Sequence, residues 1–148
     1  MSAHASAPVI DWEALRAQAE AVRGRAYAPY SGYRVGAALL AADGRVFVGA
    51  NVENASYGLC LCAERSATAA AVAAGVSQFI AIAITSPGDS PATPCGMCRQ
   101  VLAELAPGIP VHCYGAEGGV IETDVGALLP GAFDRAVLDA GRAKDAPT

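Results

Sequence analysis

Positive charge is scarce in this sequence of 148 residues. Ten Lys and Arg stand against fourteen Asp and Glu, which gives a formal net charge of −4, and Lys144 is the only lysine. Proteins that hold nucleic acid usually carry a basic face, because phosphate contacts supply most of their non-specific affinity. The positive residues here are scattered along the chain. This pattern argues against a long polyanion as partner and favours a small neutral or weakly charged substrate.

Long apolar runs and secretory features are also missing. No apolar run reaches the roughly 18 residues of a membrane span, and residues 1–10 have neither the charged nor the apolar stretch of a signal peptide. We therefore expect no membrane partner and a cytoplasmic location, where disulfides rarely persist. The five cysteines are then expected to be metal ligands or buried thiols; they are Cys60, Cys62, Cys95, Cys98 and Cys113.

The composition that is present is that of a globular protein. Apolar residues make up 53% and charged residues 16%, far from the values typical of disordered chains. The length is that of one domain. We expect a flexible segment over residues 1–10, a single domain over residues 11–134 and a polar tail over residues 135–148.

Turn residues and apolar periodicity divide the domain into helices and strands. Asp11 precedes a helical pattern that runs to Ala26, and turn residues follow at 29–32. Asp43-Gly44 predicts a hairpin between two apolar runs. The expected strands are 33–42, 45–51, 79–85, 110–114 and 120–123, and the later helices are 62–74, 95–105 and 124–129. This order favours an α/β fold in which right-handed crossovers place helices over a mixed sheet.

Two short motifs carry the chemistry. Cys62-Ala63-Glu64 begins one expected helix, and Pro94-Cys95-Gly96-Met97-Cys98 begins another. A Cys-x-x-Cys pair alone is used by zinc sites, iron–sulfur clusters and redox thiols. The combination follows the pattern of the zinc-dependent deaminases, in which His or Cys, any residue and Glu are followed by Pro-Cys-x-x-Cys.

The position of these motifs at helix starts suits metal binding. Free N–H groups and the positive end of the helix dipole favour thiolates there, and two such helices side by side would direct Cys62, Cys95 and Cys98 at one zinc ion. Zinc is usually four-coordinate, so three protein ligands leave one position for water, as in catalytic sites. Three thiolates and Zn²⁺ sum to a charge of −1, which Arg65 or Arg99 could offset, since each directly follows a motif residue.

Glu64 lies two residues past Cys62, near the metal but not needed as a ligand. A carboxylate beside a metal-activated water can take the proton of that water and pass it to the substrate. For cytosine, the water attacks C4 while N3 is protonated, and a proton then goes to the leaving amine. Glu64 can therefore serve as both base and acid.

From about Tyr27 to Phe133 the sequence resembles the small, single-domain cytidine deaminases that form homotetramers. The matching segments are Tyr27-Ala28-Pro29-Tyr30-Ser31, Val35-Gly36-Ala37-Ala38, Asn51-Val52-Glu53-Asn54, Cys62-Ala63-Glu64-Arg65, Pro94-Cys95-Gly96-Met97-Cys98-Arg99-Gln100 and Leu128-Leu129-Pro130. The resemblance implies a three-layer α/β/α fold with a mixed five-stranded sheet. It also implies zinc-dependent hydrolysis of cytidine and deoxycytidine to uridine and deoxyuridine, with release of ammonia, as in pyrimidine salvage.

The resemblance further assigns roles to single residues. It implies one Zn²⁺ per subunit on Cys62, Cys95 and Cys98, and the proton shuttle at Glu64. For the substrate it implies that Asn51 and Glu53 bind the ribose hydroxyls, that the Ala63 backbone N–H contacts the base, and that Tyr33 stands where the family commonly has Phe beside the pyrimidine. It places Tyr57 and Phe133 in a neighbouring subunit's site. It places Arg65 against the ligand thiolates. Each active site would then need the homotetramer.

Two other interpretations of the cysteines stay open. Cys60 would complete a closed four-cysteine structural zinc site, although its spacing from Cys62 is tighter than usual and Glu64 would have no purpose there. A redox pair at Cys95 and Cys98 would explain neither Cys62 nor the asparagine–glutamate pair.

Three other functions also stay open: a deaminase of another small cytosine compound such as a blasticidin-type nucleoside antibiotic, a nucleic-acid-editing deaminase, and a non-catalytic zinc-binding module. The pair Asn51 and Glu53 argues for a ribose and against the first, and the low positive charge argues against the second. Cys113 is expected to be a small buried residue of a strand, and His112 a strand residue with a satisfied side chain rather than a metal ligand.

Overall fold

The computed structural model describes residues 9–144, apart from the side chain of residue 143. Most of the segment expected to be flexible, residues 1–8, lies outside the described residues, as do residues 145–148. The elements in chain order are α1 (Trp12–Arg23), β1 (Gly36–Ala41), β2 (Val46–Ala50), the 3₁₀ turn η1 (Tyr57–Leu59), α2 (Ala63–Ala73), β3 (Phe79–Ser86), α3 (Gly96–Leu105), β4 (Pro110–Gly115), β5 (Val120–Asp124), α4 (Val125–Leu128) and α5 (Arg135–Lys144).

Five strands form one mixed sheet in the order β2-β1-β3-β4-β5. β1 and β2 are joined by the hairpin that Asp43-Gly44 predicts, and Gly44 has a φ of 88°, which suits a tight turn. β3 and β4 are parallel, and the other neighbours are antiparallel. Because β1 is antiparallel to both β2 and β3, those two strands run the same way. α2 follows β2 and α3 follows β3, so both helices begin at the same end of the sheet.

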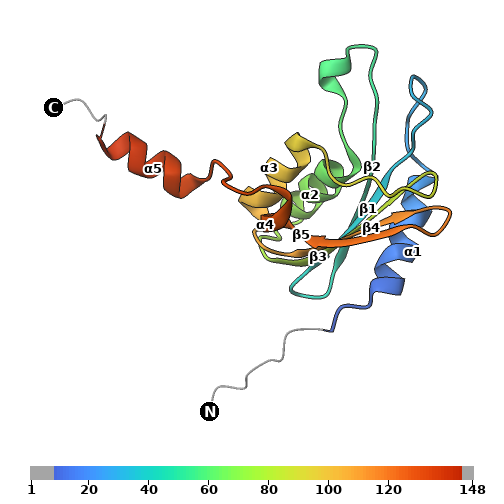
Figure 1. Ribbon diagram of the computed structural model, residues 1–148, viewed down its shortest axis with the longest axis horizontal. Helices are drawn as coiled ribbons and strands as arrows, with labels where there is room; N and C mark the ends of the chain where they lie inside the picture. The colour runs from blue at the N-terminus through green and yellow to red at the C-terminus, as the bar shows by residue number, and fades with distance from the viewer. Residues whose placement is uncertain (1–8, 145–148) are drawn as a thin grey trace.

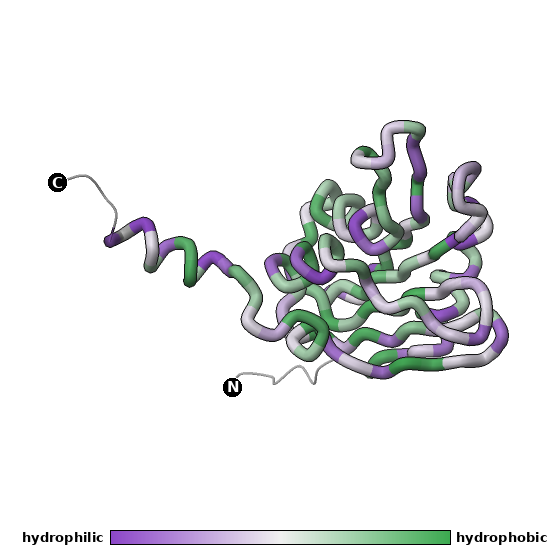
Figure 2. Tube along the Cα trace, turned by 45° about the horizontal axis from the view of Figure 1, so that its top comes forward, coloured by the Kyte–Doolittle hydropathy of each residue, from purple (hydrophilic) through white to green (hydrophobic). Residues whose placement is uncertain are grey.

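Helices cover both faces of this sheet (Figure 1). β1 is buried along its whole length, and its side chains alternate between the faces. Leu39 packs into the core that contains residues of α2 and α3, whereas Leu40 packs into the core that contains residues of α1. Hydrophobic residues follow the strands through the body of the molecule (Figure 2). The three-layer α/β/α fold with a mixed five-stranded sheet is therefore confirmed.

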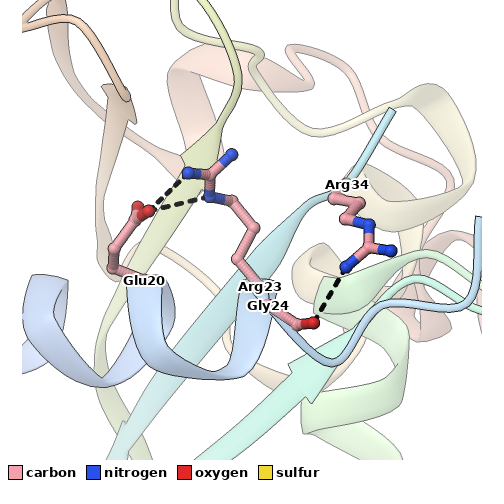
Figure 3. A network of polar contacts seen from close by, with 4 residues as sticks. All are labelled: Glu20, Arg23, Gly24 and Arg34. Carbon is pink, nitrogen blue, oxygen red and sulfur yellow. Dashed lines mark hydrogen bonds and ion pairs between the residues drawn. The ribbon is translucent and has the colours of Figure 1, made fainter. Parts of the chain in front are cut away.

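Helix α1 begins as the sequence predicts but ends earlier. Asp11 Oδ1 accepts a hydrogen bond from the Ala14 N–H at 3.0 Å, as an N-cap should. The helix stops at Arg23 rather than running to Ala26, and the Gly24 carbonyl accepts a bond from Arg34 Nη1 at 2.9 Å (Figure 3). The prediction was wrong here because a long-range contact satisfies a helix-end carbonyl, which local periodicity does not reveal. The residues after Gly24 are thereby free to form a loop beside the sheet.

Helix α2 packs closely against β2 at Gly49. A Cβ placed on Gly49 of β2 would lie 2.3 Å from the Ala63 carbonyl oxygen and 2.3 Å from the Ala67 nitrogen, both in α2. Those distances are far below van der Waals contact, so the close packing needs glycine. Gly49 thus lets the first turn of α2 sit directly on the sheet, and this turn follows Cys62.

The segment expected to be a polar tail contains a helix that the sequence analysis did not predict. Asp134 Oδ1 accepts a bond from the Val137 N–H at 2.9 Å and so caps α5, which projects away from the body (Figure 1). Val137 and Leu138 of α5 are 53% and 41% exposed. The segment is mostly polar, which favoured a tail, although its apolar and charged residues lie on different sides of the helix. No helix within residues 9–144 is long and apolar enough to cross a membrane.

Candidate active site

The fold brings three cysteines together at the starts of α2 and α3. Cys62 is the N-cap residue of α2, Cys95 is the N-cap residue of α3, and Cys98 lies in the first turn of α3. Their three Sγ atoms all lie within 4.8 Å of one another, and the Sγ atoms of Cys62 and Cys95 are 3.6 Å apart. Sulfurs around a tetrahedral zinc with 2.3 Å bonds would be about 3.8 Å apart. The donor set therefore fits zinc.

Cys60 does not join this group. Its Sγ accepts a bond from the Asn54 N–H at 3.4 Å and lies 3.8 Å from the Asn54 carbonyl oxygen, to which it can donate. Among the described residues the only group of His, Cys, Asp and Glu that could hold a metal consists of the other three cysteines. This geometry opposes the closed four-cysteine site and leaves a coordination position for water.

The electrostatics of the cysteine group favour a thiolate at Cys62. The hydrogen bond that Cys98 donates, with help from the Arg65 guanidinium, lowers the pKa of Cys62 to about 5. The same shared bond, together with burial, raises the pKa of Cys98. Since the thiolate is the form that binds metal, Cys62 is ready to bind near neutral pH.

Arg65 lies where it can offset negative charge on the sulfurs. Its Nη2 donates to the Cys60 carbonyl at 3.1 Å and to Cys62 Sγ at 3.6 Å. The sequence left open whether Arg65 or Arg99 would do this. The guanidinium of Arg99 instead bonds to Pro94, Leu128 and Thr93, and none of these contacts is to a sulfur.

Glu64 is buried beside the cysteines in a cavity of about 230 Å³. The residue is 5% exposed, and this burial raises the pKa of its carboxyl group. A carboxyl group with a raised pKa can both accept and return a proton near neutral pH. The walls are formed by Ser31, Tyr33, Val35, Asn51, Cys62, Ala63, Glu64, Ile84, Ala92, Thr93 and Cys95. A larger hollow of about 390 Å³, lined by Tyr57 and Glu53 among others, shares Ser31, Asn51 and Cys62 with this cavity.

Asn51 and Glu53 line these hollows and also hold the loop that follows α1. Asn51 Oδ1 accepts a bond from the Val35 N–H, and its Nδ2 donates to the Tyr33 carbonyl, both at 2.8 Å. The Glu53 carboxylate accepts bonds from the Ser31 hydroxyl and backbone N–H and from the N–H of Tyr30. The Ser31 hydroxyl and these N–H groups lower the pKa of Glu53, which favours the carboxylate form of this side chain in the larger hollow.

The sequence analysis did not single out Ser31 or Val35 as site residues. Both lie within segments that carried the resemblance, which was the only sequence signal for them. In the structure Ser31 borders both hollows, and the Val35 N–H is held by Asn51. They therefore belong to the wall that the loop after α1 contributes.

The three aromatic residues implied by the resemblance are placed differently. Tyr33 lines the 230 Å³ cavity, and Tyr57 lines the adjoining hollow. Phe133 lines neither; it lies past α4, where its carbonyl accepts a bond from Gln100 Nε2 at 2.8 Å, and it is 59% exposed. Within one chain the structure thus brings two of the three to the site.

Comparison with known proteins points in one direction. Residues 11–113 match the family model described as the cytidine and deoxycytidylate deaminase zinc-binding region. The chain is 48% identical over 125 residues to a cytidine deaminase from Halalkalibacterium halodurans, covering 84% of this chain and 95% of that protein. It is 46% identical over 127 residues to one from Sporosarcina psychrophila, covering 85% and 93%. The crystal structure of a cytidine deaminase from Burkholderia pseudomallei matches with 50% identity and a TM-score of 0.81, covering 84% of this chain and all of that one.

Proposed function

This chain belongs to the family of cytidine and deoxycytidylate deaminases with a zinc-binding region, and we propose that it hydrolyses cytidine and deoxycytidine to uridine and deoxyuridine with release of ammonia. The observation that carries the proposal is the buried carboxyl group of Glu64 in the same cavity as Cys62 and Cys95. A purely structural zinc site has no need of such a carboxyl group. Pyrimidine salvage is the process that this reaction serves.

Glu64 is the proton carrier of the reaction. Cys62, Cys95 and Cys98 would hold the zinc ion, which would make a water in this cavity acidic enough to react at neutral pH. Glu64 would take one proton from the water as its oxygen bonds to C4 and deliver that proton to N3. It would then move the second proton of the same oxygen to the amine, so that the C4–N bond breaks, ammonia leaves and C4 keeps the oxygen as a carbonyl. The burial that raises the pKa of Glu64 suits a residue that alternates between base and acid. Arg65 stabilises the thiolate of Cys62 by donating a hydrogen bond to its Sγ.

The nucleoside is held by residues of the cavity wall. Ala63 lines the cavity at the start of α2, where helix N–H groups lack helical partners, and its N–H binds the base. Tyr33 flanks the pyrimidine. Asn51 and Glu53 bind the ribose hydroxyls with the acceptor capacity that their loop contacts leave, since a carboxylate has about four acceptor positions. These two residues favour a nucleoside over a free base.

The active enzyme is a cytoplasmic homotetramer in which Tyr57 and Phe133 complete a neighbour's site. Both side chains are large and apolar yet 74% and 59% exposed, and Leu59 and Met97 are 69% and 62% exposed. Exposed aromatic and aliphatic groups of this size are typical of surfaces that a partner buries. The five cysteines, all within the described residues, form no disulfide, in keeping with a reducing compartment.

The first test is the ultraviolet absorbance change of cytidine and deoxycytidine incubated with the purified protein, with and without a zinc chelator. Conversion to the uridine product that stops on zinc removal is the expected result. Cytosine base and a blasticidin-type antibiotic are compared in the same assay. Turnover of the antibiotic, with cytidine unchanged by zinc-loaded protein, would instead establish the alternative substrate.

Sharing of sites between subunits has a separate test. Glu64→Ala and Phe133→Ala are each expected to be nearly inactive. Mixed and reassembled, they should regain part of the activity, because the first variant lends Phe133 to sites that keep Glu64. No recovery in mixtures that contain both subunits would overturn the shared-site proposal while leaving the reaction itself in place.

A further inference from the structure

Arg99 makes an unusual set of contacts for a residue in the first turn of a helix. Its Nε donates to the Pro94 carbonyl at 2.7 Å, its Nη2 donates to Thr93 Oγ1 at 3.0 Å, and its Nη1 donates to the Leu128 carbonyl at 2.8 Å. The first two acceptors belong to the turn that precedes Cys95. The third lies at the end of α4, where helix carbonyls lack helical partners. One half-buried guanidinium thus joins the turn before α3 to Leu128, which lies 29 positions beyond Arg99 in the chain.

Cys95 is the least supported of the three candidate zinc ligands. Cys98 is fully buried inside α3, and Cys62 Sγ is contacted by the Arg65 guanidinium. Cys95 is exposed, and its Sγ contacts another sulfur, that of Cys62 at 3.6 Å, rather than an arginine. The position of its Sγ therefore depends on how the turn over residues 93–95 is held.

The rest of the loop before this turn is anchored at other points. Ser86 Oγ, fully buried, accepts a bond from the Ala92 N–H at 2.9 Å. A Cβ placed on Gly119 would lie 1.8 Å from the Asp89 carbonyl oxygen, so the loop packs tightly on the β4–β5 turn. These contacts fix the loop up to Ala92, and the contacts of Arg99 begin at the next residue.

We propose that Arg99 is a positioning residue for the metal site. Its guanidinium fixes the turn Thr93-Pro94-Cys95 against the end of α4 and so holds Cys95 Sγ where it shares one zinc ion with Cys62 and Cys98. Groups outside the ligand set that orient the ligands commonly tune metal affinity. The inference rests on zinc binding by these cysteines and not on the identity of the substrate.

A lysine cannot replace the arginine in this role. Arginine presents five N–H donors in a rigid planar fork, and three of them are used here in different directions. The ammonium group of lysine is a compact point donor on a flexible stem, so it keeps the charge but loses the geometry. Arg99→Lys therefore separates positioning from charge.

The experiment measures zinc release from the full-length, zinc-loaded protein into an excess of chelator, followed with a metal-sensitive dye and no substrate. Arg99→Lys is expected to release zinc about tenfold faster than the wild type, as for other groups that support metal ligands. Thr93→Val removes one of the three contacts and should accelerate release by a smaller factor. Gln100→Ala is the matched control, because it removes the neighbouring bond to the Phe133 carbonyl but none from the turn, and it should release zinc at the wild-type rate.

The cobalt-substituted proteins give a second readout that a merely structural role would not move. The visible absorption bands of Co²⁺ bound to thiolates report the coordination geometry, and Arg99→Lys should alter them while Gln100→Ala should not. Wild-type release rates in both Arg99→Lys and Thr93→Val would overturn the proposal, as would equal acceleration in Gln100→Ala. If Arg99→Lys fails to fold, the zinc release rate of Thr93→Val alone tests the proposal.

Discussion

The two helices that carry the cysteines are held in place by different forces. Helix α2 is fixed by packing: Ala63, Ala67 and Ala71 are fully buried, and Gly49 allows contact with β2 too close for any other residue. At the start of α3, Pro94 and Cys98 are also fully buried, but Cys95 between them is exposed, and the turn before it receives hydrogen bonds from Arg99. The α2 side of the site is thus held mainly by packing, and the α3 side by packing together with polar contacts.

The difference matches the tasks that we propose for the two helices. Glu64 lies on α2, and a group that moves protons must stay within hydrogen-bond reach of the reacting atoms. Helix α3 supplies Cys95 and Cys98, ligands whose final positions a metal ion itself helps to set. Packing therefore holds Glu64, whereas the hydrogen bonds of Arg99 add to the packing that holds the proposed metal ligands of α3.

Loss of a ligand from α3 is expected to have the largest effect. Cys95→Ala should lose zinc, and all measurable activity with it, because two protein ligands are too few for a tight site. Zinc content after gel filtration and the rate of cytidine turnover provide the check. If Cys95→Ala kept a full equivalent of zinc, Cys95 would not be part of the metal site, and the task proposed for the start of α3 would be wrong.

Loss of the carboxyl group from α2 should separate chemistry from metal binding. Glu64→Ala is expected to keep one zinc per chain while turnover falls by about a thousandfold or more, the upper range for removal of a general acid–base group. Glu64→Gln, which preserves the shape of the side chain, should fall similarly. Zinc content and cytidine turnover are measured on the same samples. Activity near the wild-type level in either variant would refute the proposed role of Glu64.

A pair of glycine variants tests the packing difference directly. Gly49→Ala places a Cβ against the backbone of α2 and should lower the free energy of unfolding by about 1–3 kcal/mol, as overpacking does. Gly96→Ala, at the start of α3, meets open space and should change it by less than about 0.5 kcal/mol. Urea unfolding of the zinc-free proteins gives both values. Equal destabilisation by the two substitutions would show that α3 is as tightly packed as α2.

Much of the fold and of the metal site could be predicted from the sequence, because the signals are local. Asp43-Gly44 marks the hairpin with a residue type that the turn itself demands. Both cysteine motifs lie at helix starts, and a helix start can be recognised from a few consecutive residues. Parallel running of β2 and β3 then brings the motifs together without further information.

The features that the sequence did not reveal depend on contacts between distant segments. The end of α1 at Gly24 is set by Arg34 and by the departing loop. The carbonyl of Leu128, which gives Arg99 its third contact, belongs to a helix of only four residues far along the chain. Asn51 and Glu53 bond to backbone groups of the loop after α1, a role that no pattern of residue types announces. Local propensity carries no information about such pairs.

The smallest effect that we predict is on stability, and it concerns the face of the sheet covered by α1. It tests whether the contrast between α2 and α3 is confined to the site. His112 of β4 stacks on Trp12 of α1 with ring centroids 3.4 Å apart, and its Nδ1 lies 3.1 Å from the Tyr114 hydroxyl. Burial lowers the pKa of His112 below 6.5, although Glu122 on the neighbouring strand acts in the other direction. Below pH 6.5 the unfolded chain therefore binds more protons at this residue than the folded protein does, and His112 makes the fold less stable as the pH falls through that value.

His112→Phe keeps a ring against Trp12 but cannot take up a proton. The difference in urea midpoint between this variant and the wild type should therefore change between about pH 5.5 and 7.5, in favour of the variant at the acid end. Because α1 and β4 carry no metal ligand on this face, the change should be the same with and without zinc. A difference that stays flat across the range would exclude His112 as the titrating group. A pH-dependent difference that occurs only in the zinc-loaded protein would show that the two faces of the sheet are coupled. The contrast between α2 and α3 would then extend beyond the site.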